Sequence, residues 1–300
     1  MKQIAITGAS GLIGRALTKR AEASGVRVVR FVRRQPRSPD ELLWQPTQEV
    51  ALTPADLGRL ADCDAIVHLA GENVASGYWT ERKKQGIRDS RIKGTLALCH
   101  ALAQLGNPGL LVSASAVGYY GDRGDEILTE ASSAGTGFFA ELCAQWERSA
   151  DPAREAGWRV VHPRIGVVLA KEGGALAKMV TPFRFGLGAI VGHGRQYIPW
   201  ISMEDAITAI WWMIERQVAG AYNLVSPAPV TNAEFSRALG RVLHRPVWLR
   251  APAFALRVLT GEMADQALLA SERAAPQRLQ SEGFQFSDTD LESVLRRHVG

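Results

Sequence analysis

A glycine array near the amino terminus, ITGASGLIG, constrains the fold of this chain more than any other feature. Gly8, Gly11 and Gly14 stand three residues apart, between the short apolar run QIAIT and a segment with helical periodicity. The first glycine allows a tight turn, the second lets the backbone approach a pyrophosphate, and the third lets a helix pack closely. The helix N-terminus offers free N–H groups to phosphates, so the array predicts a dinucleotide-binding unit, with a purely structural turn as the alternative.

Strand-like and helix-like patterns alternate from residue 1 to about residue 170. Apolar runs such as VRVVRFV, AIVHLAG and LLVSASAVG predict buried strands, and helical patterns separate them. Parallel strands need such crossover connections, so the alternation predicts an α/β fold with a doubly wound parallel sheet and helices on both faces. Residues 138–156 are predicted to form one helix, and residues 158–169 one strand.

A strongly amphipathic pattern covers residues 202–217. Its apolar stripe includes Trp211, which favours core packing over a ligand platform. Ser202 and Asp205 stand at its start and resemble a capping box with Asp in place of Glu. We therefore expect a helix that begins at Ser202 and buries one face.

The composition shifts beyond residue 170, where residues 173–200 are rich in glycine and the strand–helix alternation stops. We expect a nucleotide-binding domain over residues 1–228, of which residues 170–200 reach into a substrate lobe. A smaller C-terminal lobe over residues 229–300 would complete the substrate side.

The end of the second predicted strand indicates which dinucleotide is bound. Proteins that prefer NAD usually carry an acid there to hold the ribose hydroxyls, but this strand ends RFVRRQPR. Arg33 and Arg34 follow the glycine loop by about 20 residues, the usual spacing of this position, and a guanidinium there pairs bidentately with a 2′-phosphate. The sequence predicts NADP(H), with Arg33 as the phosphate ligand and Arg34 as a bystander. Solvated surface charge is the alternative.

Composition narrows the range of partners. The net charge is +5, but the basic residues are scattered, so we expect no nucleic-acid partner. Cys63, Cys99 and Cys143 have no C-x-x-C spacing, which argues against a disulfide framework and a metal site. No apolar run is long enough for a membrane span, and no signal peptide is recognisable. We expect a cytoplasmic protein with a small-molecule substrate and no membrane partner.

Several motifs together resemble a known family. They are TGASGLIG, DAIVHLAG at 64–71, SRIKGT at 90–95, SASAVGYYG at 113–121, PRIGVVL at 163–169 and YIPWISMEDA at 197–206. The combination resembles the extended short-chain dehydrogenases/reductases, in particular an atypical branch, the epimerase family proteins that are similar to sugar-nucleotide epimerases. The resemblance covers nearly the whole chain. It implies a Rossmann core, a small C-terminal α/β substrate lobe and an NADP(H) cofactor.

The resemblance assigns cofactor contacts to positions along the first 170 residues. The matching positions are Gly8, Gly11, Leu12, Ile13 and Gly14 at the pyrophosphate, Arg33 at the adenosine phosphate, Leu69, Ala70 and Gly71 beside the ribose and adenine, Arg91 where many relatives have Asn, and Arg164 to Val168 at the nicotinamide end.

The same resemblance shows a departure from the usual catalytic pair. In typical members a Tyr exchanges a proton with the reacting oxygen, and a Lys four residues later lowers the phenol pKa and holds the ribose. Phe139 and Cys143 occupy these positions here. Phe139 has no proton to give, and a neutral thiol carries no positive charge. His68 lies inside an apolar strand, where a core role is favoured over that of a base.

Other polar residues remain as candidates near the expected site. Ser115 is the better match to the catalytic Ser of typical relatives, and Tyr120 could present a phenol, with packing as an equal alternative. Glu72 and Asn73 follow the carboxyl end of a parallel strand, where ligands bind in such sheets. Arg195 lies in a glycine-rich run and could meet an anionic substrate, or the run could simply cover the sheet edge.

Two functional hypotheses remain open. The first is an NADP(H)-dependent oxidoreductase or epimerase that acts on a carbonyl compound or a sugar nucleotide. The second is a non-catalytic NADP(H)-binding sensor or regulatory protein, which an intact cofactor loop beside a missing acid would suit. The oligomeric state is left open.

Overall fold

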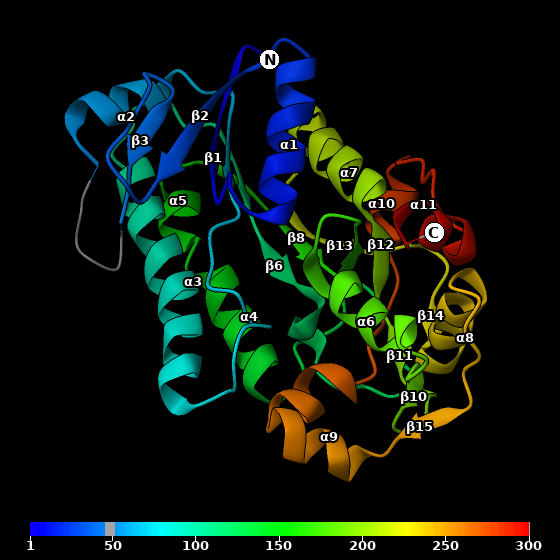
Figure 1. The fold of residues 1–300 in the computed structure, drawn as a ribbon. Helices are drawn as coiled ribbons and strands as arrows, with labels where there is room; N and C mark the ends of the chain where they lie inside the picture. Colours follow the sequence, from blue (N-terminus) through cyan, green and yellow to red (C-terminus); the bar gives the residue numbers. More distant parts are fainter. Residues whose placement is uncertain (46–51, 300) are drawn as a thin grey trace.

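The computed structural model describes residues 1–45 and 52–299, and its centre is a parallel sheet (Figure 1). The strand order is β13-β8-β5-β4-β1-β2-β3, with β6 also paired to β8. The strands are β1 (Gln3–Thr7), β2 (Arg27–Val32), β3 (Glu41–Leu43), β4 (Ala65–His68), β5 (Leu110–Ser113), β6 (Ser115–Ala116), β8 (Arg159–Ile165) and β13 (Gly220–Leu224). The order runs outward in both directions from β1 and β4, so the predicted doubly wound Rossmann fold is confirmed.

Helices cover both faces of this sheet. α1 (Leu12–Ala23) and α7 (Met203–Arg216) lie side by side on one face, and α2 (Pro54–Ala61), α3 (Glu81–Leu102) and α5 (Asp151–Glu155) lie on the other (Figure 1). Successive strand residues point to opposite faces. Accordingly Ile4 and Ile6 join the core under α1 and α7, while Ala5 joins the core under α3. Both faces are therefore buried, which explains the continuous apolar runs in the sequence.

Two predicted elements are interrupted. The helix predicted over 138–156 is α4 (Phe138–Arg148) followed by α5, because Pro152 has no N–H to continue the first helix. The strand predicted over 158–169 divides at Gly166, where a Cβ would lie 2.1 Å from Pro199 O. Its second part, β9 (Val167–Leu169), pairs with β12 (Trp200–Ser202).

One half of the capping box predicted at the start of α7 is confirmed, and the other half is wrong. Ser202 Oγ accepts the N–H of Asp205 at 3.0 Å, and Trp211 is buried. The reciprocal half of the capping box is wrong, because the Asp205 carboxylate accepts the N–H groups of Ser287 and Asp288 at 2.9 and 3.0 Å. The Asp205 carboxylate thus bonds to the C-terminal segment instead of capping its own helix.

Shorter elements form the predicted substrate-side part, which extends along the right-hand side and the bottom of Figure 1. Its helices are α6 (Gly174–Arg184), α8 (Asn232–Val242), α9 (Ala253–Thr260), η3 (Ala264–Leu268), α10 (Gln277–Ser281) and α11 (Leu291–Val299). Its strand pairs are β10 (Ala189–Val191) with β15 (Leu249–Ala251), β11 (Tyr197–Ile198) with β14 (Val230–Thr231), and β16 (Arg273–Ala274) with β7 (Ile127–Leu128). The last pair, together with the Lys84–Glu262 ion pair at 2.7 Å, joins the substrate-side part to the sheet region.

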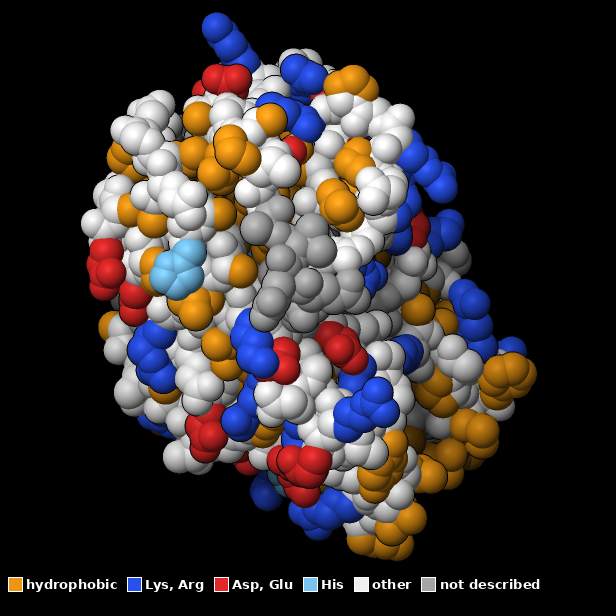
Figure 2. All heavy atoms as spheres, turned by 90° about the vertical axis from the view of Figure 1, so that its left-hand side faces the viewer, with side chains coloured by type: hydrophobic (Ala, Val, Ile, Leu, Met, Phe, Trp, Pro, Cys, Tyr) orange, Lys and Arg blue, Asp and Glu red, His pale blue; other side chains and the backbone are white. Residues whose placement is uncertain are grey.

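Apolar side chains are exposed in this same part. They include Phe185, Trp248, Phe254, Val258 and Leu259. Figure 2, which turns the left-hand side of Figure 1 toward the viewer, shows hydrophobic side chains gathered at the lower right edge. Over the rest of this face, charged and hydrophobic side chains are interspersed. Within residues 1–45 and 52–299, no helix has the length and hydropathy that crossing a membrane requires.

Candidate cofactor and substrate site

The glycine turn between β1 and α1 combines close packing with one open position. A Cβ on Gly8 would lie 2.8 Å from the carbonyl carbon of Leu69, and a Cβ on Gly14 would lie 2.2 Å from Gly8 O. At Gly11 only Gly8 O lies within 4 Å among the described atoms, at 3.2 Å. Gly8 and Gly14 are therefore needed by the fold itself, while the space beside Gly11 is available to a ligand.

The N-terminus of α1 has no side-chain cap. Four other helices are capped by a hydroxyl, from Thr53, Thr80, Ser202 and Thr231. The first-turn N–H groups of α1, at Leu12 and Ile13, are therefore placed to receive an anionic group, and the helix dipole favours a phosphate there. These features fit the pyrophosphate of a dinucleotide.

The start of α6 closes over this turn. A Cβ on Gly174 would lie 2.8 Å from Cδ2 of Leu12 and 4.0 Å from Val168 O. Leu12, predicted at the pyrophosphate, and Val168, predicted at the nicotinamide end, therefore approach the same point on α6.

Arg33 and Arg34 differ sharply at the end of β2. Arg34 donates from Nη1 and Nη2 to the Glu41 carboxylate at 2.8 and 2.7 Å. This bidentate pair, with the Arg37 N–H, lowers the pKa of Glu41 to about 2. Arg33 is exposed, and its guanidinium makes no hydrogen bond or ion pair within the part of the chain that the structure describes. Arg33 is thus free to receive a phosphate, and Arg34 is already engaged.

The carboxyl end of β4 is held by a buried polar chain. Thr7 Oγ1 accepts the N–H groups of Leu69 and Ala70, both at 3.1 Å. Its own proton therefore goes to Nδ1 of His68, 2.7 Å away, and the other ring nitrogen donates to Thr95 Oγ1 at 3.0 Å. Burial lowers the pKa of His68 to about 4, so the ring is neutral. The core role of His68 is favoured, because both ring nitrogens are occupied.

Arg91 packs directly under the end of β4. A Cβ on Gly71 would lie 3.2 Å from its guanidinium carbon, and Nη1 donates to Glu72 O at 3.0 Å. The guanidinium also lies over the Trp146 ring, 5.1 Å from its centroid. Burial lowers the pKa of Arg91 from its ordinary value, and the charge of Glu72 opposes that effect. Arg91 is thus a cation that has no carboxylate within ion-pair distance among the described residues.

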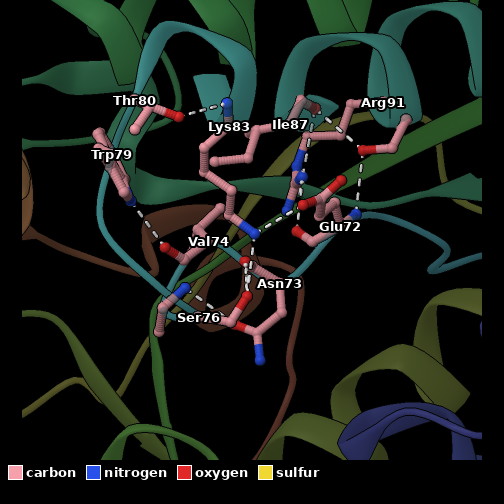
Figure 3. A network of polar contacts seen from close by, with 11 residues as sticks. Glu72, Asn73, Val74, Ser76, Trp79, Thr80, Lys83, Ile87 and Arg91 are labelled. Carbon is pink, nitrogen blue, oxygen red and sulfur yellow. Dashed lines mark hydrogen bonds and ion pairs between the residues drawn. The ribbon is translucent and has the colours of Figure 1, made fainter. Parts of the chain in front are cut away.

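Glu72 and Asn73 shape the loop beyond β4 (Figure 3). Lys83 Nζ lies 2.6 Å from Glu72 Oε1 and donates to Ser76 Oγ at 2.9 Å. Asn73 Oδ1 accepts the N–H of Ala75 at 2.9 Å in an Asx turn. Both predicted substrate-side residues therefore support the loop, and their remaining surface is exposed.

Ser115 and Tyr120 belong to an interior network. Ser115 Oγ donates to Glu147 Oε1 at 2.7 Å, and Glu147 pairs with Arg164 through Oε1 and Oε2 at 2.8 and 2.9 Å. Arg164 Nη1 donates to the Tyr120 hydroxyl at 2.9 Å, which lies 2.7 Å from Asn223 Oδ1. Burial raises the pKa of Tyr120 to about 12.

This network bears on three predicted roles. Tyr120 has no exposed surface, so the structure favours its packing role over that of a phenol in the site. Ser115 is 2% exposed, and its hydroxyl is turned to Glu147. Arg164 is 4% exposed and stacks 3.5 Å from the centroid of the Tyr119 ring. All three side chains are buried, and they support the site through their contacts with other side chains of the protein interior.

Phe139 and Cys143 lie on α4, one helical turn apart. The Phe139 ring contacts Trp79 edge-on, with centroids 5.0 Å apart, and a Cβ on Gly118 would lie 3.2 Å from Phe139 Cβ. Cys143 is buried, and burial raises the pKa of its thiol to about 12. The thiol therefore stays protonated and is a poor nucleophile.

Arg195 lies in a loop that hydrogen bonds hold in place. The Arg195 N–H donates to Nδ1 of His193 at 2.9 Å, and the buried Gln196 donates to Val191 O and Leu268 O at 3.0 and 3.2 Å. The Arg195 side chain is exposed. No group of three or more His, Cys, Asp or Glu side chains suited to a metal ion occurs in the described ranges.

Sequence reasoning missed three residues at this site. Glu147 carried a usable signal, since it follows Cys143 by four residues on the same helix face. Lys83 reaches Glu72 from the first turn of α3, which no motif indicates. Glu272 comes from the C-terminal segment to Gly118, beside the first turn of α4, and only the tertiary fold brings it there.

The chain is similar to known proteins along nearly its whole length. The model of the NAD dependent epimerase/dehydratase family matches residues 4–224, and a domain of unknown function, DUF1731, matches residues 251–297. An epimerase family protein of Mycobacterium bovis is 46% identical over 293 residues, which cover 97% of this chain and 96% of the relative. Epimerase family protein YfhF of Bacillus subtilis is 34% identical over 299 residues, covering 99% and 97%.

A solved structure shares the same fold. The crystal structure of the human epimerase family protein SDR39U1 with NADPH superposes with a TM-score of 0.87 at 31% identity. The match covers 99% of this chain and 98% of the human chain.

Proposed function

This chain belongs to the NAD dependent epimerase/dehydratase family, and on that premise we propose that it binds NADP(H) and transfers hydride to and from a small carbonyl compound or a sugar nucleotide. The family as a whole is NAD(P)-dependent, and the choice of the phosphorylated cofactor is specific to this proposal. We place the protein in the cytoplasm, with no nucleic-acid or membrane partner.

The contrast between Arg33 and Arg34 carries the proposal. Arg34 is held by Glu41, whereas Arg33 is exposed beside the glycine turn, where the 2′-phosphate of NADP(H) would lie. The human relative crystallised with NADPH, at 31% identity, supports the same choice.

The described residues fit the rest of the dinucleotide. The open position at Gly11 and the uncapped first turn of α1 suit the pyrophosphate, and the backbone of Leu69 to Gly71 would run beside the ribose. Arg91 is a cation that packs against Gly71, at the carboxyl end of β4. Bound NADPH would supply the hydride, and the protein would hold the reacting carbon against it and exclude water.

A second candidate function is a non-catalytic NADP(H) sensor. The burial of Tyr120 and the protonated state of Cys143 favour it, since neither group could exchange a proton with a substrate. A sensor would respond to the cofactor by a change in affinity for a partner.

Calorimetric titration with NADPH and with NADH tests the cofactor choice. We expect NADPH to bind at least tenfold more tightly, because one charge-assisted contact contributes about 1.5–3 kcal/mol. Equal affinities would refute the proposal. NADPH consumption in the presence of a panel of ketoses, quinones and nucleoside-diphosphate sugars then separates the two functions. Turnover supports the oxidoreductase or epimerase, and tight binding without turnover supports the sensor.

A further inference from the structure

Glu272 lies in a segment that is fixed against the sheet region. Just before it, Ser271 N donates to Asp122 Oδ1 at 3.1 Å, and Ser271 Oγ donates to Gly124 O at 2.6 Å. Just after it, β16 pairs in parallel with β7. The backbone at Glu272 is therefore held on both sides, so its side chain starts from a defined position.

The Glu272 side chain reaches η2 (Val117–Tyr120) and α4. Its Oε1 lies 3.9 Å from the position that a Cβ would take on Gly118, and Phe139 Cβ lies 3.2 Å from the same position. When it is ionised, Glu272 also raises the pKa of the Cys143 thiol, one turn along α4. The Glu272 carboxyl group and Phe139, which stands at the usual Tyr position, therefore approach the same point of η2.

No cation neutralises this carboxyl group. Its oxygens make no hydrogen bond or ion pair within residues 1–45 and 52–299. The titratable groups that face it are Asp122, from the loop before β7, and Cys143. The neighbouring Arg273 lies over the Tyr197 ring instead, 4.9 Å from its centroid.

These surroundings keep the carboxyl group protonated near neutral pH. Burial, and then the negative charge of Asp122, raise the pKa of Glu272 to about 8. The residue as a whole is nevertheless only partly buried, so part of its surface is in contact with solvent. A protonated acid that is reachable from solvent is what a proton donor requires.

We propose that Glu272 is the acid and base of this site, in place of the absent Tyr, and that it exchanges a proton with the substrate oxygen. This inference rests on the proposed NADP(H)-dependent function. It explains how a family member with Phe139 and Cys143 on α4 keeps a proton-transfer group at the nicotinamide end.

The step balances without a further reactant. In reduction, the carbonyl carbon receives a hydride, with its electron pair, from NADPH, and the carbonyl oxygen receives the proton of the Glu272 carboxyl. The substrate becomes an alcohol, NADPH becomes NADP⁺, and Glu272 becomes a carboxylate that regains a proton from water. In oxidation the carboxylate accepts the alcohol proton as the hydride leaves for NADP⁺.

Proton release on cofactor binding tests this placement without a substrate. The nicotinamide of NADP⁺ is positively charged and that of NADPH is neutral, so only NADP⁺ would lower the pKa of an adjacent carboxyl group. At pH 8 we expect NADP⁺ to release up to about half a proton per chain more than NADPH, measured by calorimetry in buffers of different ionisation enthalpy. Any proton exchanged by the 2′-phosphate is common to both forms and cancels.

Two variants make the result specific. Glu272→Gln should abolish the difference between NADP⁺ and NADPH while both still bind. Glu262→Gln removes a carboxylate of the same region that is exposed and paired with Lys84, and it should keep the difference. If both forms bind and the wild type shows no difference, or if Glu272→Gln retains it, the assignment of Glu272 is overturned. If neither form binds, the proposed function itself fails.

If the wild-type protein reduces a carbonyl compound of the substrate panel, the turnover rate with that compound provides an independent test. Glu272→Gln should lower kcat about 10²–10⁴-fold with little change in the KM for NADPH. The wild-type rate of reduction should fall above pH 8, because the carboxyl group loses its proton. The rate of the variant should not show this fall. A variant that keeps the wild-type rate and pH profile would exclude the role.

A stability measurement separates this result from misfolding. In the folded state the pKa of Glu272 lies above its ordinary value of 4.5, so the folded protein holds the extra proton between pH 4.5 and about 8. Wild-type stability therefore declines as the pH rises through this range. Glu272→Gln has no such group and should be at least as stable as the wild type at pH 9.

Discussion

Arg164 donates from Nε and Nη2 to the two carboxylate oxygens of Glu147, at 2.8 and 2.9 Å, in the interior of the protein. The side chains are 5% and 13% exposed. Through this pair α4 is joined to β8, and Ser115 and Tyr120 attach to it from β6 and η2. The helix that carries Phe139 is thereby fixed to the sheet.

Glu147→Gln should destabilise the protein by about 3 kcal/mol at pH 7, because it leaves the Arg164 charge buried without a partner. Urea unfolding followed by circular dichroism measures the change. Glu141→Gln on the same helix is the control, since that carboxylate is 61% exposed and 3.9 Å from Arg88. The control should change stability by less than about 0.5 kcal/mol. Equal effects of the two variants would contradict this account.

The same pair gives a pH dependence. Burial alone would raise the pKa of Glu147, but the hydrogen bond and charge of Arg164 outweigh it, so the pKa lies below the ordinary 4.5. Its stabilisation is complete above pH 4.5 and is lost as the pH falls through the lower folded-state pKa. The difference in unfolding free energy between wild type and Glu147→Gln should therefore shrink below pH 4.5. A constant difference from pH 7 to pH 3 would show that the ion pair is not its origin.

Gly11→Ala and Gly14→Ala should separate binding from folding. A Cβ at Gly14 would lie 2.2 Å from Gly8 O, so Gly14→Ala should lose about 2 kcal/mol or more of stability. Gly11 has a φ of −72°, which alanine adopts readily, and its nearest described neighbour is 3.2 Å away. Gly11→Ala should fold with a stability change below about 1 kcal/mol and bind NADPH at least about tenfold more weakly. Thermal unfolding and NADPH titration check both. Unchanged NADPH affinity in Gly11→Ala would place the pyrophosphate elsewhere.

Arg33→Ala should weaken NADPH binding about 10- to 100-fold, because it removes a charge-assisted contact with the 2′-phosphate. NADH has no such phosphate, so its affinity should not change. Arg37→Ala, an exposed arginine on the same loop, is the control and should alter NADPH affinity less than about threefold. Fluorescence titration with both cofactors provides the measurement. A parallel loss of NADH affinity would show that Arg33 acts on the loop and not on the phosphate.

The three thiols should be unreactive in the folded protein. Burial raises the pKa of Cys63 to about 11 and the pKa values of Cys99 and Cys143 to about 12, from an ordinary value of 9. Because the thiolate is the reacting form, modification at pH 8 should be slowed by on the order of 100-fold or more. A chromogenic disulfide reagent should therefore count three thiols only after unfolding. Fast reaction of a single thiol, mapped to Cys143 by peptide mass, would reopen its role as a nucleophile.

Features that depend on local backbone geometry were predictable from the sequence. The glycine turn could be read from ITGASGLIG because Gly8 and Gly14 contact atoms that lie within the turn or at the next strand. The alternation of apolar runs predicted the parallel sheet, because strands buried on both faces and amphipathic helices have different periods. The choice of Arg33 over Arg34 stays a prediction, which the pairing of Arg34 with Glu41 supports.

Partners that come from distant segments were not predictable. The Asp205 carboxylate bonds to Ser287 and Asp288 rather than capping its own helix, and the Tyr120 hydroxyl is taken by Arg164 and Asn223. The sequence alone states which groups can donate or accept a hydrogen bond. The burial of these groups and the distances between them in the folded chain decide which hydrogen bonds form.

The sequence by itself determined the fold class and the turn formed by the glycine array, and it predicts that Phe139 and Cys143 replace the usual Tyr and Lys. Only the tertiary structure decided that Tyr120 is enclosed and that Glu272 and Phe139 approach Gly118 together. The physical reason is that periodicity and turn chemistry act over a few residues. The proton affinity of a carboxyl group depends instead on every charge and apolar surface that folding brings within a few ångströms.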